Sequence, residues 1–170
     1  MLLEFKKMTN EEMYRLVHDV YFEASFEIAK EKHPNLSDLT EAIREEEHYF
    51  VEKFLNKFFS KNENVYYVLE EEDKWVSALR LTKLDGFYYL EALETAPNQR
   101  KKGYASKLIC EVIKLIEKNE QAVIRSNVNK TNYASLATHK KCGFVIEKEN
   151  GINYILGTER ENVYGMLYKN

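Results

Sequence analysis

The middle of the chain constrains the fold most strongly, because its apolar residues follow the two-residue period of strands and then change to a helical period. Three short runs are rich in aromatic and β-branched residues, with polar turn residues between them. These runs are Val65–Glu70, Trp75–Thr82 and Phe87–Thr95. From about Lys102 to Lys118, apolar residues recur every three or four positions instead. The pattern predicts an antiparallel meander of three strands, followed by an amphipathic helix.

The segments on either side of the meander complete a mixed α/β (α+β) pattern. Thr9 and Glu12 have the spacing of a capping box, which predicts a helix that begins there and ends before Pro34. A second helix is expected from about Asp38, with an apolar side that extends to Phe58. The remaining elements are expected as strands at Leu2–Met8, Ala122–Val128, Phe144–Lys148 and Asn162–Tyr168, and as a helix at Asn132–Lys141. The order β-α-α-β-β-β-α-β-α-β-β predicts a single domain that spans residues 1–170.

Charge and composition argue against several classes of function. The formal net charge is −3, which speaks against a general nucleic-acid-binding surface. Because no basic region with a long apolar run opens the sequence and no apolar stretch approaches the length of a membrane span, we expect a cytoplasmic protein. Cys110 and Cys142 are not in a CxxC motif and are expected to be reduced and partly buried. His18, His33 and His48 lack the spacing of metal ligands, so we expect no metal.

A cluster of cations, Arg100–Lys102, stands with Gly103 where the third meander strand gives way to the long helix. The first amides of a helix have no partner within it, and the aligned peptide dipoles add positive charge there. Gly103 has no Cβ, so an anion can approach the backbone closely. The turn is therefore a candidate diphosphate site on the amides of residues 100–106. The alternative is a solvated turn in which Gly103 serves only packing, and neither a P-loop nor a GxGxxG motif is present.

Two stretches flank the predicted strand Ala122–Val128 and carry recognisable motifs. The first, Arg100-Lys101-Lys102-Gly103-Tyr104-Ala105, has the form R/Q-x-x-G-x-G/A. The second begins at Asn132 and is a predicted helix that ends in Gly143-Phe144, where the glycine can take the left-handed conformation. Together they resemble the signatures of the GNAT superfamily of acyl-CoA-dependent N-acetyltransferases, closely over Phe87–Phe144 and loosely over the whole element order. The resemblance implies a GNAT-like mixed, mostly antiparallel sheet with splayed central strands, flanked by helices.

The resemblance also implies acetyl-CoA as the acyl donor. Its pantetheine arm would lie between Phe87–Thr95 and the strand after the long helix, paired with backbone groups near Leu93 and Thr95. An amide near Glu94 would stabilise the oxyanion of the tetrahedral intermediate. The cofactor-binding residues implied in this way are Leu93, Thr95, Arg100, Lys101, Lys102, Gly103, Tyr104, Ala105, Ser106, Asn132 and Ser135. From the residues alone, Asn132 fits equally well as a plain N-cap, and Tyr104 as a cover for the helix start.

His139 stands where many members of the superfamily carry a tyrosine that protonates the departing thiolate. A charged imidazole can perform this step, and the nearby helix C-terminus is expected to favour the charged form. The alternative is an ordinary half-buried histidine. Glu91 and Glu94 are candidates for the base that takes a proton from the amine, or else solvent-facing strand charges. Alternation along the strand places Glu91 on the same face as Leu93 unless a bulge intervenes.

The predicted reaction is transfer of an acetyl group from acetyl-CoA to a primary amine, by direct attack through a tetrahedral intermediate. The histidine variant resembles a branch of the superfamily that acts on small molecules, so a small-molecule amine is the expected acceptor. We expect no nucleic acid or membrane partner, and the pattern allows a homodimer. The alternatives are acetylation of a protein N-terminus or lysine, and a non-catalytic CoA-binding sensor.

Overall fold

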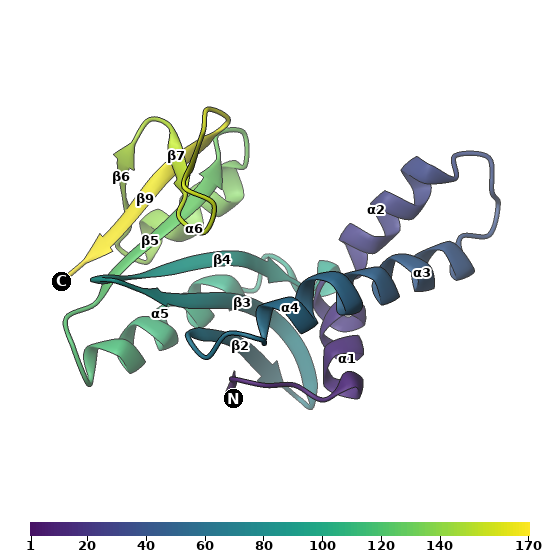
Figure 1. The fold of residues 1–170 in the computed structure, drawn as a ribbon, viewed down its shortest axis with the longest axis horizontal. Helices are drawn as coiled ribbons and strands as arrows, with labels where there is room; N and C mark the ends of the chain where they lie inside the picture. Colours follow the sequence, from purple (N-terminus) through teal and green to yellow (C-terminus); the bar gives the residue numbers. More distant parts are fainter.

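The computed structural model describes residues 1–170 and contains one large and one small sheet (Figure 1). The strand order of the large sheet is β1-β2-β3-β4-β5-β9-β6, in which only β4 and β5 are parallel. The strands are β1 (Leu2–Phe5), β2 (Asn64–Glu71), β3 (Lys74–Leu84), β4 (Phe87–Thr95), β5 (Val123–Asn129), β6 (Val145–Lys148), β7 (Gly151–Asn153), β8 (Thr158–Arg160) and β9 (Val163–Lys169). The helices are α1 (Asn10–Val20), α2 (Phe22–Lys32), α3 (Thr40–Phe50), the π-helical turn η1 (Val51–Leu55), α4 (Asn56–Phe58), the 3₁₀ turn η2 (Pro97–Gln99), α5 (Tyr104–Glu117) and α6 (Tyr133–Lys141). The predicted class, a mixed and mostly antiparallel sheet flanked by helices, is confirmed.

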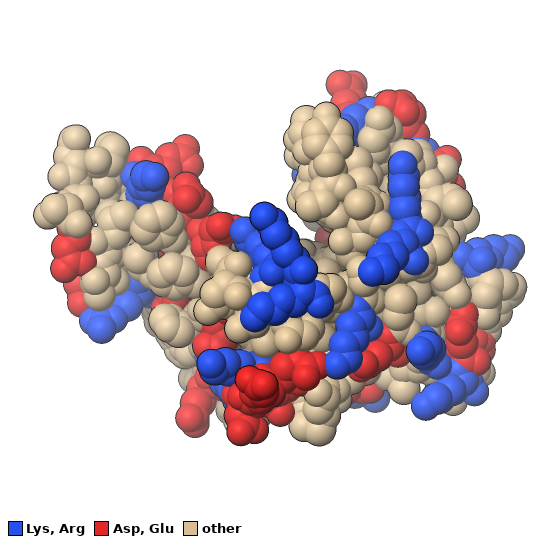
Figure 2. Space-filling view, turned by 180° about the vertical axis from the view of Figure 1, so that it is seen from behind, with Lys and Arg blue, Asp and Glu red and all other residues tan.

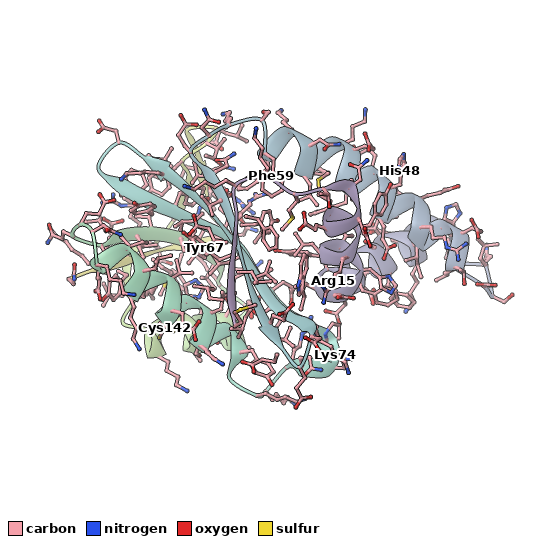
Figure 3. All side chains as sticks on the ribbon, turned by 90° about the horizontal axis from the view of Figure 1, so that it is seen from below. Arg15, His48, Phe59, Tyr67, Lys74 and Cys142 are labelled. Atoms are coloured by element: carbon pink, nitrogen blue, oxygen red, sulfur yellow. The ribbon has the colours of Figure 1, made fainter.

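Helices cover both faces of the β1–β4 part of the sheet. On one face, the apolar stripe of α5 buries Leu108 and Ile109 in the larger core cluster. On the other face, α1 buries Leu16 and Val17 in a second cluster. Figure 3 shows these two layers, with Cys142 beside α5; both cysteines are free thiols, as expected. None of the helices combines the length and the hydropathy needed to span a bilayer.

The large sheet divides between β4 and β5. Their parallel ladder ends where Leu90 lies opposite Ser126, although β4 continues to Thr95 and β5 to Asn129. In Figure 1, β5, β9 and β6 turn away from β1–β4 as a separate wing, while α2 and α3 project on the other side. Beyond Leu90, the edge of β4 that faces β5 has no strand partner. This is the splay of central strands that the resemblance implies.

A bulge in β4 follows the divergence directly. The β3–β4 register shifts between Glu91 and Glu94, and Ala92 takes a left-handed φ of +49°. The Tyr21 hydroxyl donates a hydrogen bond to the Ala92 carbonyl at 2.5 Å. Burial raises the pKa of Tyr21 well above its usual value, so the hydroxyl keeps its proton. A tertiary contact therefore holds a backbone conformation that is costly for a residue other than glycine.

The N-terminal helices differ in part from the prediction. The capping box is confirmed, since the Thr9 hydroxyl accepts from the Glu12 amide and the Glu12 carboxylate from the Thr9 amide. The single long helix expected there is wrong: the chain turns at Tyr21, whose ring enters the core, and α2 begins anew. The next helix begins at Thr40, whose amide donates to the Asp38 side chain at 2.9 Å. The first strand is shorter than predicted.

The β7–β8 hairpin has no counterpart among the predicted elements. Its strands are three residues each and lack the apolar alternation that marks a strand. A distant side chain fixes it instead: the Asn127 amide donates to the Ile152 carbonyl at 2.7 Å. Gly151 lies so close to Asn127 that an added Cβ would come within 2.2 Å of Oδ1. This signal is tertiary and therefore invisible to local periodicity.

We predict that Gly143→Ala destabilises the fold more than Gly86→Ala. Both glycines have positive φ, +88° and +78°, so alanine at either position costs about 1–2 kcal/mol of strain. Only at Gly143 would the new Cβ also crowd a neighbour, lying 3.1 Å from the Tyr168 ring. Urea unfolding of both variants measures the difference in free energy, and equal losses would contradict the crowding.

Candidate functional site

A cavity of about 690 Å³ lies between the end of β4, the start of α5 and one face of α6. We call it the first cavity. It is lined by Glu23, Leu93, Glu94, Thr95, Gln99, Arg100, Lys101, Gly103, Tyr104, Ala105, Ser106, Asn132, Ala134, Ser135, Ala137, Thr138 and Lys141. Every cofactor residue expected from the sequence lines it except Lys102. Figure 2 shows basic side chains gathered in the hollow between the α2–α3 hairpin and the β5–β9–β6 wing.

The start of α5 supplies unpaired donors to this cavity. The first helical hydrogen bond of α5 is donated by the Lys107 amide to the Gly103 carbonyl at 3.0 Å. The amides of Tyr104, Ala105 and Ser106 precede it and have no acceptor within the helix. Gly103 has φ +84°, and an added Cβ would meet nothing within 4 Å, so its role is backbone conformation rather than packing. The result is a row of donors at the positive end of a helix, open to an anion.

The cations of the turn are arranged differently from the mobile cluster expected. Arg100 is held by the carboxylates of Glu23 and Glu94, and the bond from Arg100 lowers the pKa of Glu23. Lys102 lies outside the cavity, and its Nζ donates to Gln99 Oε1 at 2.8 Å. Lys101 is exposed, lines the cavity and has no side-chain partner. The amides of α5 and a single lysine of the turn therefore replace the predicted triad of free cations.

One face of α6 forms the opposite wall. The Asn132 side chain accepts from the Ser135 amide at 3.0 Å, which is the N-cap role left open by the sequence, and both residues also line the cavity. The face continues through Ala137, Thr138 and Lys141, which were missed. Steps of three from Ser135 reach Thr138 and then Lys141, and a step of three from Ala134, which also lines the cavity, reaches Ala137.

His139 does not line the first cavity. Its side chain is 2 % exposed, Nδ1 lies 2.9 Å from the Ser135 carbonyl oxygen, and Nε2 lies 3.3 Å from Ser126 Oγ. Because a carbonyl only accepts, Nδ1 carries the proton and Nε2 accepts from the Ser126 hydroxyl. Burial lowers the pKa of His139 and outweighs the hydrogen bond to the Ser135 carbonyl, which raises it, so the expected preference for the charged ring is wrong. Since Ser126 is in the last pair of the β4–β5 ladder, the ring lies at the point where the strands part.

A second cavity of about 780 Å³ lies on another side of β4. Glu91 and Arg80 line it from the sheet, the η1–α4 segment forms one wall, and the β7–β8 turn adds Ile155 and Leu156. Arg80 Nε lies 3.4 Å from Glu91 Oε2. The side chains of this pair are largely covered, with exposed fractions of 28 % for Arg80 and 18 % for Glu91.

The bulge changes which side of β4 its side chains face, compared with a regular strand. Glu91 lines the second cavity, whereas Leu93 packs on the α5 side and lines the first. Ala92 packs on the α1 side, so the inserted residue reverses the expected order of faces. The bulge therefore produces the exception that the alternation argument allowed, and Glu91 does not share a face with Leu93. Glu94 lines the first cavity and is bonded to Arg100.

The sequence profile of the acetyltransferase (GNAT) family matches residues 14–144, which include both motifs and both candidate bases. The chain belongs to this family. No curated protein matches the chain in sequence. The membership confirms the resemblance drawn from the two motifs.

Solved structures of GNAT acetyltransferases share this fold. The PaiA N-acetyltransferase from Thermoplasma acidophilum, in complex with coenzyme A, superposes with a TM-score of 0.68 at 14% identity, covering 100% of this chain and 99% of that one. The ribosomal-protein-S18-alanine N-acetyltransferase from Escherichia coli gives a TM-score of 0.61 at 15% identity, with coverage of 99% and 94%. The aminoglycoside 6'-acetyltransferase type Ii gives 0.63 at 13% identity, with coverage of 99% and 96%. At these identities the likeness establishes the fold.

GNAT enzymes use acetyl-CoA, and similar solved structures hold CoA or acetyl-CoA, which confirms the expected acyl donor for the family. The first cavity suits such a ligand, since unpaired amides face it at one end and the unpaired edge of β4 lies at the other. No three His, Cys, Asp or Glu side chains are grouped so as to hold a metal ion.

We predict that acid destabilises this GNAT protein in part through His139. The unfolded chain takes up a proton on this residue near pH ~6.5, whereas burial lowers the pKa in the folded chain. The unfolded state therefore binds more protons, and the free energy of unfolding falls as the pH falls through about 6.5. Urea titrations at about pH 7.5 and about pH 5.5 should show a smaller loss for His139→Gln than for the unmodified chain. Equal losses in the two proteins would contradict the assignment.

Proposed function

We propose that the protein transfers the acetyl group of acetyl-CoA to the primary amine of a small molecule. The observation that carries the proposal is the divergence of β4 and β5 after Leu90 and Ser126, beside a cavity that ends at the unpaired amides of α5. A thioester held along the unpaired edge of β4 would be approached from the second cavity, which is lined by Glu91. The two substrates would then meet at the bulge.

The donor would be held mainly by backbone groups. Its diphosphate would accept hydrogen bonds from the amides of Tyr104, Ala105 and Ser106, with Lys101 adding charge. Its extended arm would pair with the edge of β4 near Leu93, as an added strand pairs with a sheet edge. These contacts would fix the position of the thioester carbonyl while leaving its reactive face open.

In the proposed reaction, the neutral amine attacks the thioester carbonyl carbon, a C–N bond forms, and the C–S bond then breaks. The amides that follow Ala92 at the bulge would stabilise the oxyanion, which is the role expected near Glu94. Glu91 would take the proton that the amine must lose, because it is the carboxylate at the boundary between the second cavity and the bulge.

His139 receives a different role from the proton donation expected. With Nδ1 bonded to Ser135 and Nε2 accepting from Ser126, the neutral ring has no free proton to give. We assign it to positioning: it ties α6 to β5 at the point where the strands part. A thiolate with an ordinary pKa of about 8.5 can leave without a dedicated donor and take its proton from water.

Release of free CoA from acetyl-CoA, measured across a panel of small amines and N-terminal or lysine peptides, tests the function. Turnover with small amines and none with peptides supports the proposal. Turnover with peptides alone would mean that the acceptor is a protein N-terminus or lysine rather than a small molecule. If no amine causes release of CoA but acetyl-CoA raises the melting temperature, the protein would be a sensor that binds CoA without catalysis.

We predict that Ser106→Asp weakens acetyl-CoA binding by at least about tenfold without destabilising the fold. A carboxylate in the first turn of α5 interacts favourably with the helix dipole, yet it repels a diphosphate on the neighbouring amides. Calorimetric titration with acetyl-CoA and urea unfolding measure the two effects separately. Ser106→Ala is the matched control and should bind almost normally. Unchanged affinity in the aspartate variant would place the diphosphate elsewhere.

We predict that Glu91→Gln lowers kcat/KM for the amine about 10²-fold near neutral pH, with affinity for acetyl-CoA unchanged. The loss should shrink as the pH rises, because the amine then reaches the site already deprotonated. Glu94→Gln is the comparison, since Glu94 lines the other cavity and should cost less. A larger loss for Glu94→Gln would exchange the roles of the two carboxylates.

A further inference from the structure

We propose that the second cavity selects a zwitterionic acceptor, whose amine faces Glu91 and whose carboxylate or phosphate is bound by Arg80. This inference rests on the proposed function and names the substrate class of the same site.

Arg80 is a largely covered cation that lines the second cavity. Its Nε has no hydrogen-bond partner, and the contact with Glu91 Oε2 at 3.4 Å is an ion pair without hydrogen-bond geometry. Burial alone would lower the pKa of Arg80, but Glu91 and Tyr66 raise it, so the group stays charged. The neighbouring Tyr66 hydroxyl is also buried without a partner. A buried donor in the state of the Arg80 Nε–H is rare and costly, which points to a ligand of the second cavity that pairs with it.

A guanidinium presents a planar fork of donors, which matches the two oxygens of a carboxylate or phosphate. Glu91 lies next to it in the same cavity and matches an ammonium. In place of their contact with each other, Arg80 can therefore bind the anionic group of a zwitterion and Glu91 its ammonium group. A purely cationic polyamine would satisfy Glu91 but leave Arg80 facing a second positive charge.

The wall of the second cavity adds unpaired positive charge. Lys53, Lys57 and Lys61 recur every four residues along the η1–α4 segment and the turn after it, and all three line the cavity. None of them has a carboxylate oxygen within 4.0 Å, whereas Lys83 in the same lining is paired with Glu120 at 2.6 Å. Five basic residues line the cavity against three acidic ones, in a chain whose net charge is −3. This local excess attracts an anion rather than a bare cation.

Apolar residues of the second cavity indicate that the uncharged part of the acceptor is apolar too. Phe54 and Phe58 on one wall and Ile155 and Leu156 on the other are apolar, and three of these four are exposed, at 49 %, 45 % and 72 % for Phe54, Ile155 and Leu156. An amino acid with an apolar side chain would cover this surface while its charged groups reach Arg80 and Glu91. Phenylalanine is therefore the probe of choice, and phenethylamine is its match without the carboxylate.

The test measures both turnover and direct binding for phenylalanine, phenethylamine, 2-aminoethyl phosphate and spermidine. Phenylalanine should exceed phenethylamine by at least about tenfold in kcat/KM and in affinity measured by calorimetry without acetyl-CoA. Arg80→Gln should bring that ratio to about one, Arg80→Lys should keep part of it, and Lys57→Gln should lower it less. Lys118→Gln, at the far end of α5, is the control and should change nothing. Unchanged affinity for acetyl-CoA in the Arg80 variants shows that they are folded.

The outcomes separate this inference from the proposed function. Turnover of phenethylamine or spermidine at least as fast as that of the zwitterions would overturn the inference and leave the acetyltransferase intact. If no amine is acetylated, the proposed function fails, and calorimetry still decides the inference: equal affinity for phenylalanine and phenethylamine overturns it. Preference for 2-aminoethyl phosphate over phenylalanine would support it and identify the anionic group as a phosphate.

Discussion

The parting of β4 and β5 after the Leu90–Ser126 pair is the constraint on which the rest of the site depends. Had the parallel ladder continued, the edge of β4 would be occupied and no room would remain between the strands. Side-chain hydrogen bonds surround the point where the strands part. His139 joins α6 to Ser126 at the last pair, and the Asn127 amide is shared between the Tyr89 hydroxyl at 2.8 Å and the β7–β8 hairpin. Backbone groups left unpaired by this arrangement are available to an extended ligand.

The bulge then gives the two sides of β4 different chemistry. Because Ala92 is inserted into the alternation, Glu91 remains with the second cavity while Leu93 turns to the first. The two cavities therefore meet different side chains of one short stretch of strand. The Tyr21 hydroxyl holds the bulge through the Ala92 carbonyl, so the break between α1 and α2 contributes directly to the conformation of β4 between the two cavities.

The sequence could predict the features that depend on the spacing of residues close together in the chain. The capping box at Thr9, the start of α5 at Gly103 and the Asn132 cap each depend on residues within one turn of each other. The meander depends on the strand period and on the turn residues between its runs, and the structure has all of these features. The contacts that the sequence could not supply join distant residues. Arg100 is bound to Glu23, 77 positions away, and the burial of His139 depends on the sheet beneath α6. For the same reason, the bulge was foreseen only through the family resemblance.

Folding leaves Arg80 charged but without a full set of hydrogen-bond partners. Its charge is stabilised in the folded chain by the ion pair with Glu91 and by the Phe58 ring, whose centroid lies 5.7 Å from the guanidinium carbon. Neither contact satisfies the Nε–H, and an unmet buried donor costs about 1–3 kcal/mol. Folding therefore leaves one donor unpaired that an oxyanion in the second cavity could pair with. Because the guanidinium is already largely covered and lies beside Glu91, an anion bound there would spend little free energy on ordering it.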